Sequence, residues 1–130
     1  MDKIDRIIDL LNAETGGEVS FDRDAIDVDR PEAWGALELR SQADTQWADG
    51  RPIDDAWLAD LYLCVEDRES HWIALVNRAL AAADEEMPLS WSMAERTYVA
   101  QLEKLLWRWQ IRIWGPLEIP EENAGDPEGG

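Results

Sequence analysis

Hydrophobic and polar residues alternate most clearly near the end of the chain, between Trp107 and Trp114. From 107 to 113 every odd-numbered position is large and apolar, while the even-numbered positions between them are polar. A period of two places successive side chains on opposite faces of a β-strand, whereas a helix repeats its apolar positions every three or four residues. The pattern predicts a strand with one buried face. Its polar face carries Arg108 and Arg112.

The middle of the chain is predicted to form a long antiparallel hairpin. Between 34 and 46, Leu37 and Leu39 alternate with polar residues, and the segment from 53 to 66 keeps the same period. The dipeptide Asp49-Gly50 lies between them, and both of its residues tolerate the positive φ angles that tight hairpin turns require. The tip is therefore expected near Asp49 and Gly50, with Pro52 ending the turn.

Two segments have the spacing of amphipathic helices. Apolar residues from Ile4 to Leu11 recur every three or four positions, and Gly16-Gly17 marks the end of this first helix. The second helix follows the possible N-caps of 67–70 and places one apolar face on its residues from Trp72 to Ala83. Between the first helix and the hairpin, residues 18–33 are expected to form a loop with a brief edge segment at 18–21.

The segment from 89 to 106 allows two interpretations. Alternation resumes at Leu89, which favours a strand over 89–100 that turns at 101–104 and pairs with the strand of 105–114. Residues 94–106 are also rich in Ala, Glu, Gln, Leu and Lys, which are good helix formers. A helix over 94–106 is the alternative.

These elements together predict an α+β fold with a largely antiparallel four-stranded sheet and two helices packed on it. The length of 130 residues suits one domain, which we place at residues 1–116. Residues 117–130 are rich in Glu, Pro and Gly and cannot bury enough apolar surface to become ordered. We expect them to form a flexible, acidic and disordered C-terminal tail.

The composition indicates a soluble protein that folds without metals or disulfides. Hydrophobic residues make up 45% of the chain, and there are 8 tryptophans. Cys64 is the only cysteine and lies in an apolar run, where it is expected to be a buried small side chain. The N-terminus lacks the pattern of a signal peptide, and no stretch approaches the ~20 apolar residues of a membrane span. We therefore expect a protein of the reducing cytoplasm, without a membrane partner.

The charge balance argues against tight binding of nucleic acid. The chain has 29 acidic and 12 basic side chains, a formal net charge of -17, whereas phosphate binding needs clustered cations. Such a charge suits solubility, a surface past which DNA slides without adhering, or a surface that imitates DNA.

The chain offers little for catalysis or for cofactors. His71 is the only histidine and is expected at the start of the second helix in a structural or solvated role. With one histidine and one cysteine, a His- or Cys-based metal site cannot be assembled within one chain. Phosphate loops and nucleophile elbows are missing from the sequence. We therefore expect neither an enzyme nor a cofactor or metal site.

Tryptophan is enriched at protein interfaces, and this small domain has more tryptophans than one core needs. Trp47 beside the predicted hairpin tip, and Trp114 on the same strand face as Arg108 and Arg112, are the best candidates for contact with a partner.

The order of elements, together with three segments, resembles the tail terminator proteins of long-tailed bacteriophages. The segments are 31–39 (PEAWGALEL), 47–65 (WADGRPIDDAWLADLYLCV) and 107–113 (WRWQIRI), and the similarity extends over residues 4–115. The likeness is one of strands and turns and includes no catalytic motif.

The resemblance implies a structural virion protein that forms a ring, typically a hexamer, on the end of the growing tail tube. It would stop tube polymerisation and present the head-tail joining surface, at the head-proximal end of the tail, after assembly in the host cytoplasm. DNA would pass through an acidic channel without specific binding. A ring needs a heterologous interface, which would set Arg40, Arg108 or Arg112 against the acidic loop of the next subunit. The hairpin tip, with Trp47, Asp49, Gly50 and Arg51, would contact the tail tube protein or a neck protein.

Two other functions fit the sequence. A head-side neck connector or head-closure protein shares a small α+β architecture and ring assembly. A small acidic inhibitor that mimics DNA belongs to a different class; the mixture of acids with Trp-rich strands disfavours it, because DNA mimics present regularly spaced surface carboxylates.

Overall fold

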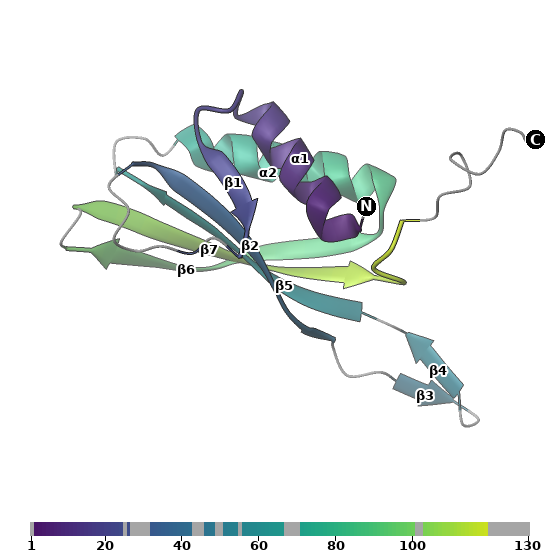
Figure 1. The fold of residues 1–130 in the computed structure, drawn as a ribbon. Helices are drawn as coiled ribbons and strands as arrows, with labels where there is room; N and C mark the ends of the chain where they lie inside the picture. The colour runs from purple at the N-terminus through teal and green to yellow at the C-terminus, as the bar shows by residue number, and fades with distance from the viewer. Residues whose placement is uncertain are drawn as a thin grey trace, which may run out of the picture.

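In the computed structural model two helices cover one face of a five-stranded sheet, and no described helix lies on the other face (Figure 1). The structure describes residues 2–24, 26, 32–42, 46–48, 51–54, 56–66, 71–100 and 103–119, and for residues 41, 42, 46–48 and 51–54 it describes the backbone alone. In chain order the elements are α1 (Lys3–Glu14), β1 (Ser20–Arg23), β2 (Trp34–Gln42), β3 (Gln46–Ala48), β4 (Arg51–Asp54), β5 (Ala56–Val65), α2 (His71–Glu86), β6 (Leu89–Val99) and β7 (Lys104–Trp114).

The strand order β1-β2-β5-β7-β6 confirms an α+β fold with two helices but corrects the predicted sheet. The sheet has five strands instead of four and is mixed, because β1 pairs with β2 in parallel, Phe21 opposite Gly35. The sequence gives only a weak signal for β1, since this strand has four residues and buries Phe21 alone. A parallel neighbour also requires a long connection, here residues 24–33, which the sequence pattern reads as loop.

The predicted central hairpin is confirmed in two parts. β2 and β5 are antiparallel, from Trp34 opposite Cys64 to Gln42 opposite Trp57, with an irregularity between Leu39 and Ser41. β3 and β4 continue the hairpin as a separate two-stranded sheet, which we call the ribbon (residues 46–48 and 51–54), and it projects beyond the main sheet (Figure 1). The predicted tip residues Asp49 and Gly50 lie outside the described residues.

The alternative helix over 94–106 is wrong, because β6 and β7 form an antiparallel pair from Leu89 opposite Ile113 to Val99 opposite Lys104. A shift in register between Met93 and Glu95 adds one residue to β6. That bulge breaks the period of two, and the helix-forming composition of the segment then competes with a weakened strand pattern.

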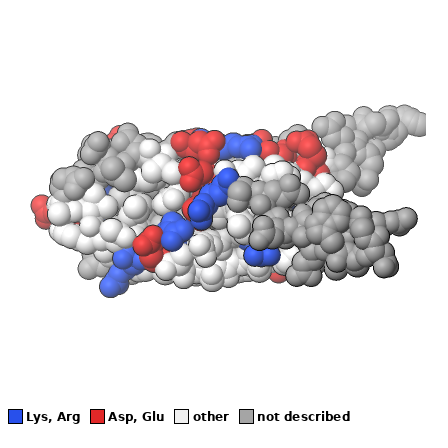
Figure 2. Space-filling model, turned by 90° about the horizontal axis from the view of Figure 1, so that it is seen from below, with Lys and Arg blue, Asp and Glu red and all other residues white. Residues whose placement is uncertain are grey.

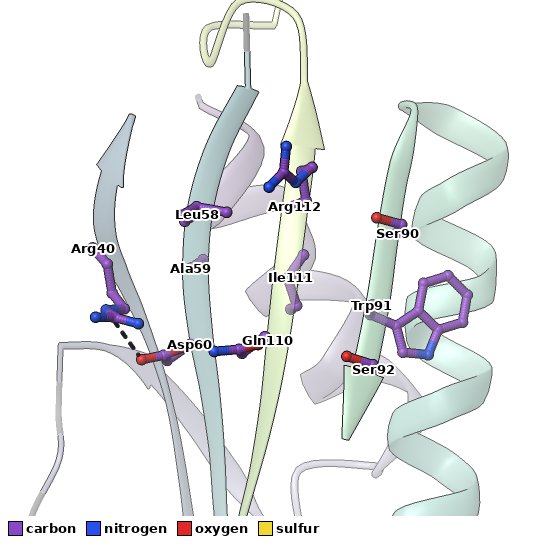
Figure 3. A pocket seen from close by; sticks show the side chains of 10 residues that line it. All are labelled: Arg40, Leu58, Ala59, Asp60, Ser90, Trp91, Ser92, Gln110, Ile111 and Arg112. Atoms are coloured by element: carbon purple, nitrogen blue, oxygen red, sulfur yellow. Dashed lines mark ion pairs between the residues drawn. The ribbon is translucent and has the colours of Figure 1, made fainter. Parts of the chain in front are cut away.

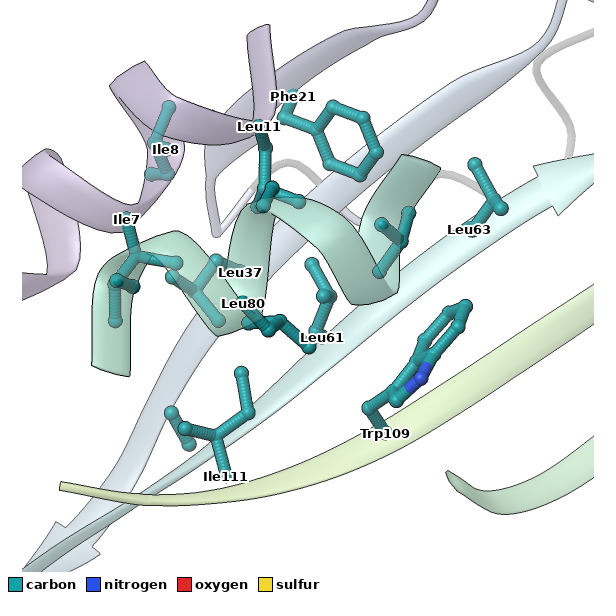
Figure 4. Packing of buried hydrophobic residues seen from close by; sticks show 14 of the residues in the cluster. Ile7, Ile8, Leu11, Phe21, Leu37, Leu61, Leu63, Leu80, Trp109 and Ile111 are labelled. Carbon is teal, nitrogen blue, oxygen red and sulfur yellow. The ribbon is translucent and has the colours of Figure 1, made fainter. Parts of the chain in front are cut away.

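The core lies between the helices and the facing side of the sheet (Figure 4). Trp109, Ile111 and Ile113 of β7 are almost wholly buried there, which confirms the dry face that their spacing predicts. The helix residues that meet them are also those predicted from helical spacing: Ile4, Ile7, Ile8 and Leu11 of α1, and Trp72, Val76, Ala79, Leu80 and Ala83 of α2. Neither described helix is long and apolar enough to cross a membrane.

The start of α1 is fixed by its own cap and by the end of the domain. The Asp2 carboxylate accepts a hydrogen bond from the Asp5 backbone N–H at 2.9 Å, as an N-cap should. The backbone of Asp2 also forms an isolated antiparallel β-bridge with that of Glu118, and the Lys3 backbone N–H donates to the Leu117 carbonyl at 2.9 Å. Residues 117–119 of the predicted tail therefore lie beside α1, and residues 120–130 are outside the described part of the chain.

Candidate interaction surface

The helix-free face of the sheet is the candidate functional surface. Figure 2 views this face and shows acidic and basic side chains next to one another along a diagonal band. Four residues, one each on β2, β5, β6 and β7, account for the ion pairs of this band: Arg40, Asp60, Glu95 and Arg108. We call these four residues the charged band.

Asp60 is the centre of the charged band. Its residue is 4% exposed, yet its carboxylate meets two cations: Arg40 Nε lies 3.4 Å from Oδ2, and Arg108 Nη1 lies 3.3 Å from Oδ1. A buried carboxylate is costly unless it is paired and hydrogen-bonded, so Asp60 holds both guanidinium groups against the sheet. The register explains the convergence: Asp60 is paired with Gln110 and Tyr62 with Arg108, so Asp60 and Arg108 are diagonal neighbours on the same face of β5 and β7.

Arg108 is held from a second side by β6. Its Nε donates to Glu95 Oε1 at 2.9 Å, and Glu95 is its direct cross-strand partner. Burial lowers the pKa of Arg108, but the hydrogen bond to Glu95 and the charges of Asp60 and Glu95 outweigh it, so the pKa lies above its ordinary value. Arg108 is therefore a fixed, permanently charged group on this face.

A shallow hollow of about 380 Å³ lies beside the charged band (Figure 3). Ser90 and Ser92 of β6 border it on one side and Arg40 on the other, with Gln110 and Arg112 of β7 between them. The lining combines hydroxyl, amide and guanidinium groups, which suit hydrogen bonds to polar side chains or backbone of a protein partner.

Arg112 and Trp114 extend the surface toward the end of β7. The Arg112 guanidinium carbon lies 5.3 Å from the centre of a Trp114 ring, within the range of a cation–π contact. The Trp114 carbonyl accepts a hydrogen bond from Lys3 Nζ at 2.9 Å, which ties the strand end to α1. Aromatic and arginine side chains together are typical of interface centres.

The opposite end of this face is apolar and closed. Trp34, Ala36 and Cys64 are fully buried, with Tyr62 and Leu106 packed against them. Burial raises the pKa of the Cys64 thiol, although Lys104 and Trp34 oppose that shift, so the thiol is kept protonated at neutral pH. This confirms Cys64 as a buried hydrophobic side chain. Burial, together with the charges of Asp60 and Glu38, likewise raises the pKa of Tyr62.

The structure brings four of the predicted interface residues onto one face: Arg40, Arg108, Arg112 and Trp114. Trp47 and Arg51 belong to the ribbon, in β3 and β4, apart from that face in the fold. Asp49 and Gly50 lie outside the described residues. The predicted surface is thus two regions: the helix-free face and the ribbon.

Sequence reasoning missed Asp60 and Glu95, the acids that position the arginines. A signal for Asp60 was present, because it interrupts the apolar run of β5 at an even-numbered position, on the face opposite Leu61 and Leu63. Its partner became visible only with the register of β5 against β7.

Other side chains that could take part in catalysis or metal binding do not come together in the described part of the chain. His71 is exposed at the start of α2, as predicted, with its ring 4.5 Å from that of Trp72. Among the described residues, no group of three His, Cys, Asp or Glu side chains is placed to hold a metal ion.

Comparisons with known proteins leave the family open. No protein-family model matches the chain, and a search of curated proteins finds none that matches it. A functional proposal therefore rests on the sequence pattern and on the geometry of this surface.

Proposed function

We propose that this protein is a structural virion protein that forms a ring on the end of a phage tail tube, stops tube polymerisation and provides the head-tail joining surface. The observation that supports it best is the helix-free face, where Arg40 and Arg108 are held in place by the buried Asp60 and the cross-strand Glu95. Charges that are already oriented lose little side-chain entropy when a partner arrives, so they serve recognition well.

The charged band contains both signs of charge within one surface. In a ring, each subunit presents one patch to a different patch on its neighbour, and charge complementarity fixes the register of that contact. Glu95 is 55% exposed and Arg40 51% exposed at their side chains, so both ends of the band remain accessible to a neighbour.

The net charge of -17 supports the same proposal. A ring whose channel is acidic repels the phosphate backbone, which lets DNA move through without adhering. This argument concerns the whole chain and assigns no individual acid to the channel.

The test is the solution mass by light scattering over a wide concentration range, with and without purified tail tubes. The proposal expects a closed ring of about six chains, alone or on tubes, and electron microscopy should show it at tube ends. A protein that stays monomeric and ignores tubes contradicts the proposal. Binding to purified heads instead of tails would favour the head-side neck connector.

A matched pair of variants links the test to the helix-free face. Arg108→Glu reverses the charge at the centre of the band, and Arg78→Glu makes the same change on α2, where Arg78 is 68% exposed and pairs with Glu14. We expect Arg108→Glu to abolish ring formation and Arg78→Glu to leave it unchanged. Circular dichroism checks that both variants fold. Equal assembly of the two folded variants would remove Arg108 from the interface.

A further inference from the structure

The two edges of the five-stranded sheet are built differently. At the β1 edge, the Asn12 side chain donates from Nδ2 to the Phe21 carbonyl at 3.0 Å and accepts from the Phe21 N–H at 2.8 Å. These are the backbone groups of Phe21 that point away from β2, so α1 itself caps this edge. The strand is also only four residues long. A partner strand has little to pair with there.

The β6 edge is open by contrast. β6 has eleven residues and pairs with β7 on one side, and no other described strand pairs with it on the second side. Every residue from Ser92 to Tyr98 is exposed, including the large side chains of Met93 at 41% and Tyr98 at 60%. A long strand edge with free N–H and C=O groups is a template for another strand.

The outward-facing backbone groups of β6 follow from one hydrogen bond. The Trp114 N–H donates to the Pro88 carbonyl at 3.0 Å, so this opposed pair is of the hydrogen-bonded kind. In an antiparallel pair the two kinds alternate, so β6 residues opposite odd-numbered β7 residues point their N–H and C=O groups outward. With the bulge counted in the register, these residues are Leu89, Trp91, Met93, Arg96 and Tyr98, and the Leu89 N–H already donates to Asp84 Oδ1 at 3.2 Å.

Charged side chains on an edge strand usually discourage another strand from pairing with it, but two charged side chains of β6 lie over the sheet instead. Glu95 is held by Arg108 at 2.9 Å on the helix-free face. The Arg96 guanidinium carbon lies 5.5 Å from the centre of a Trp107 ring, over β7. Both charges are drawn back over the sheet, which leaves the backbone between them accessible to a strand.

The ribbon packs very little against the other described elements. β3 and β4 have three and four residues, and among the described elements they pack substantially only on each other. A two-stranded hairpin of this size is marginally stable in water and gains stability from a third strand. The ribbon projects from one end of the molecule, while the end of β6 and the start of β7 lie at the opposite end (Figure 1).

We infer that the ribbon of one copy of this chain adds to the free edge of β6 in the next copy. Each subunit then donates a ribbon at one end and receives one at the other, which is a heterologous contact that closes into a ring when the rotation allows it. The inference rests on the proposed function for that closure, and it names the contact that joins neighbouring subunits.

Two complementary variants test the contact. Tyr98→Pro removes an outward N–H and adds a ring at the edge without losing a bond to β7, so this chain can donate a ribbon but not receive one. In the second variant a short glycine-rich turn replaces residues 43–55, so this chain can receive a ribbon but not donate one. Tyr98→Ala is the control, because it removes the same exposed side chain and keeps the N–H.

Light scattering at concentrations where the unaltered chain assembles gives the readout. We expect each of the two variants alone to be monomeric, their equimolar mixture to form dimers and no larger species, and Tyr98→Ala to assemble like the unaltered chain. In the unaltered chain, amide hydrogen exchange at Met93, Arg96 and Tyr98 should slow at least tenfold on assembly.

The opposite results overturn the inference: Tyr98→Pro assembling normally with a native circular dichroism spectrum, or a mixture that stays monomeric. These results are separable from those that test the ring on tail tubes. Rings that still cap tubes when Tyr98 is proline refute the strand contact alone. Dimers in the mixture, from a protein whose assemblies ignore tubes, refute the tail function alone.

Discussion

The two faces of the sheet use the same strands for different purposes. On the helix-covered face, Trp109 and Ile111 are each 1% exposed and meet apolar side chains of α1 and α2. On the helix-free face, the intervening Arg108, Gln110 and Arg112 make ion pairs, border the hollow or remain exposed. One strand of alternating residues thus contributes both to the core of the domain and to the polar face that we propose as its interaction surface. Substitutions on the two faces should therefore have separable effects.

The largest effect is expected on the helix-covered face. Trp109→Ala removes a fully packed indole and its hydrogen bond to Asn77 Oδ1 at 3.2 Å, and should lower the free energy of unfolding by about 3–5 kcal/mol. Gln110→Ala, one residue along on the other face, should change it by less than about 0.5 kcal/mol. Urea denaturation of the two variants measures the contrast. Similar losses in both variants would mean that the two faces contribute equally to the stability of the domain.

A smaller loss of stability is expected at Gly35, where the helix-covered face has no room for an added side chain. Gly35 of β2 lies against the Phe21 ring of β1, and a Cβ at this position would overlap that ring. Gly35→Ala should therefore cost about 1–3 kcal/mol of stability, because the ring must move in a close-packed core. Phe21→Leu in the same chain should recover part of the loss. A double-mutant cycle without coupling between these two positions would show that the strain lies elsewhere.

The elements that the sequence predicts well are those with a repeated burial pattern. β7 and β5 alternate over many residues against a continuous core, and α1 and α2 repeat their apolar positions over several turns. β1 is not predicted as a paired strand of the sheet, because four residues with one buried side chain are too few to show a repeated pattern. The bulge in β6 reverses the pattern after Met93, so the same segment also matches a helix.

The charged band shows how far the candidate interaction surface can be predicted from the sequence. Arg108 and Arg112 follow from the alternation of β7, but their partners follow from strand order and register, which no local pattern contains. Asp60 and Glu95 are 35 residues apart in sequence and meet Arg108 only because β5 and β6 flank β7. Candidate arginines were thus predictable, and the acids that position them were not.

On the helix-free face the strongest effect on stability is expected at its buried acid. Asp60→Asn keeps the shape of the side chain but removes the charge shared by Arg40 and Arg108, and should cost about 1–3 kcal/mol. Glu95→Gln changes an exposed partner of the same Arg108 and should cost less than about 1 kcal/mol. Thermal unfolding of the two variants compares them. Equal and small losses would mean that Asp60 orients the arginines without stabilising the fold.

The smallest effect should come from Asp2, whose charge joins the start of α1 to Arg23 at the end of β1. Burial raises the pKa of Asp2, but the hydrogen bond from the Asp5 backbone and the pairing with Arg23 at 2.8 Å outweigh it, so the pKa falls below its ordinary value of 3.8. A carboxylate whose pKa is lowered by folding stabilises the protein above its unfolded-state pKa, and that contribution is lost as the pH falls through the lowered value. Asp2→Asn keeps the cap, since asparagine is an equally good N-cap, and loses only the charge.

We therefore expect Asp2→Asn to cost about 0.5 kcal/mol at neutral pH, because the pairing is partly exposed and the carboxylate lies at the positive end of α1. The difference from the unaltered chain should shrink once the pH drops below 3.8 and vanish in stronger acid. Asp9→Asn, at an exposed position of the same helix, is the control for a general change in charge. Urea denaturation between neutral and acidic pH provides the measurement. A difference that stays constant with pH would show that the amide disturbs the cap itself, and the charge of Asp2 would then have no part in holding α1 to the sheet.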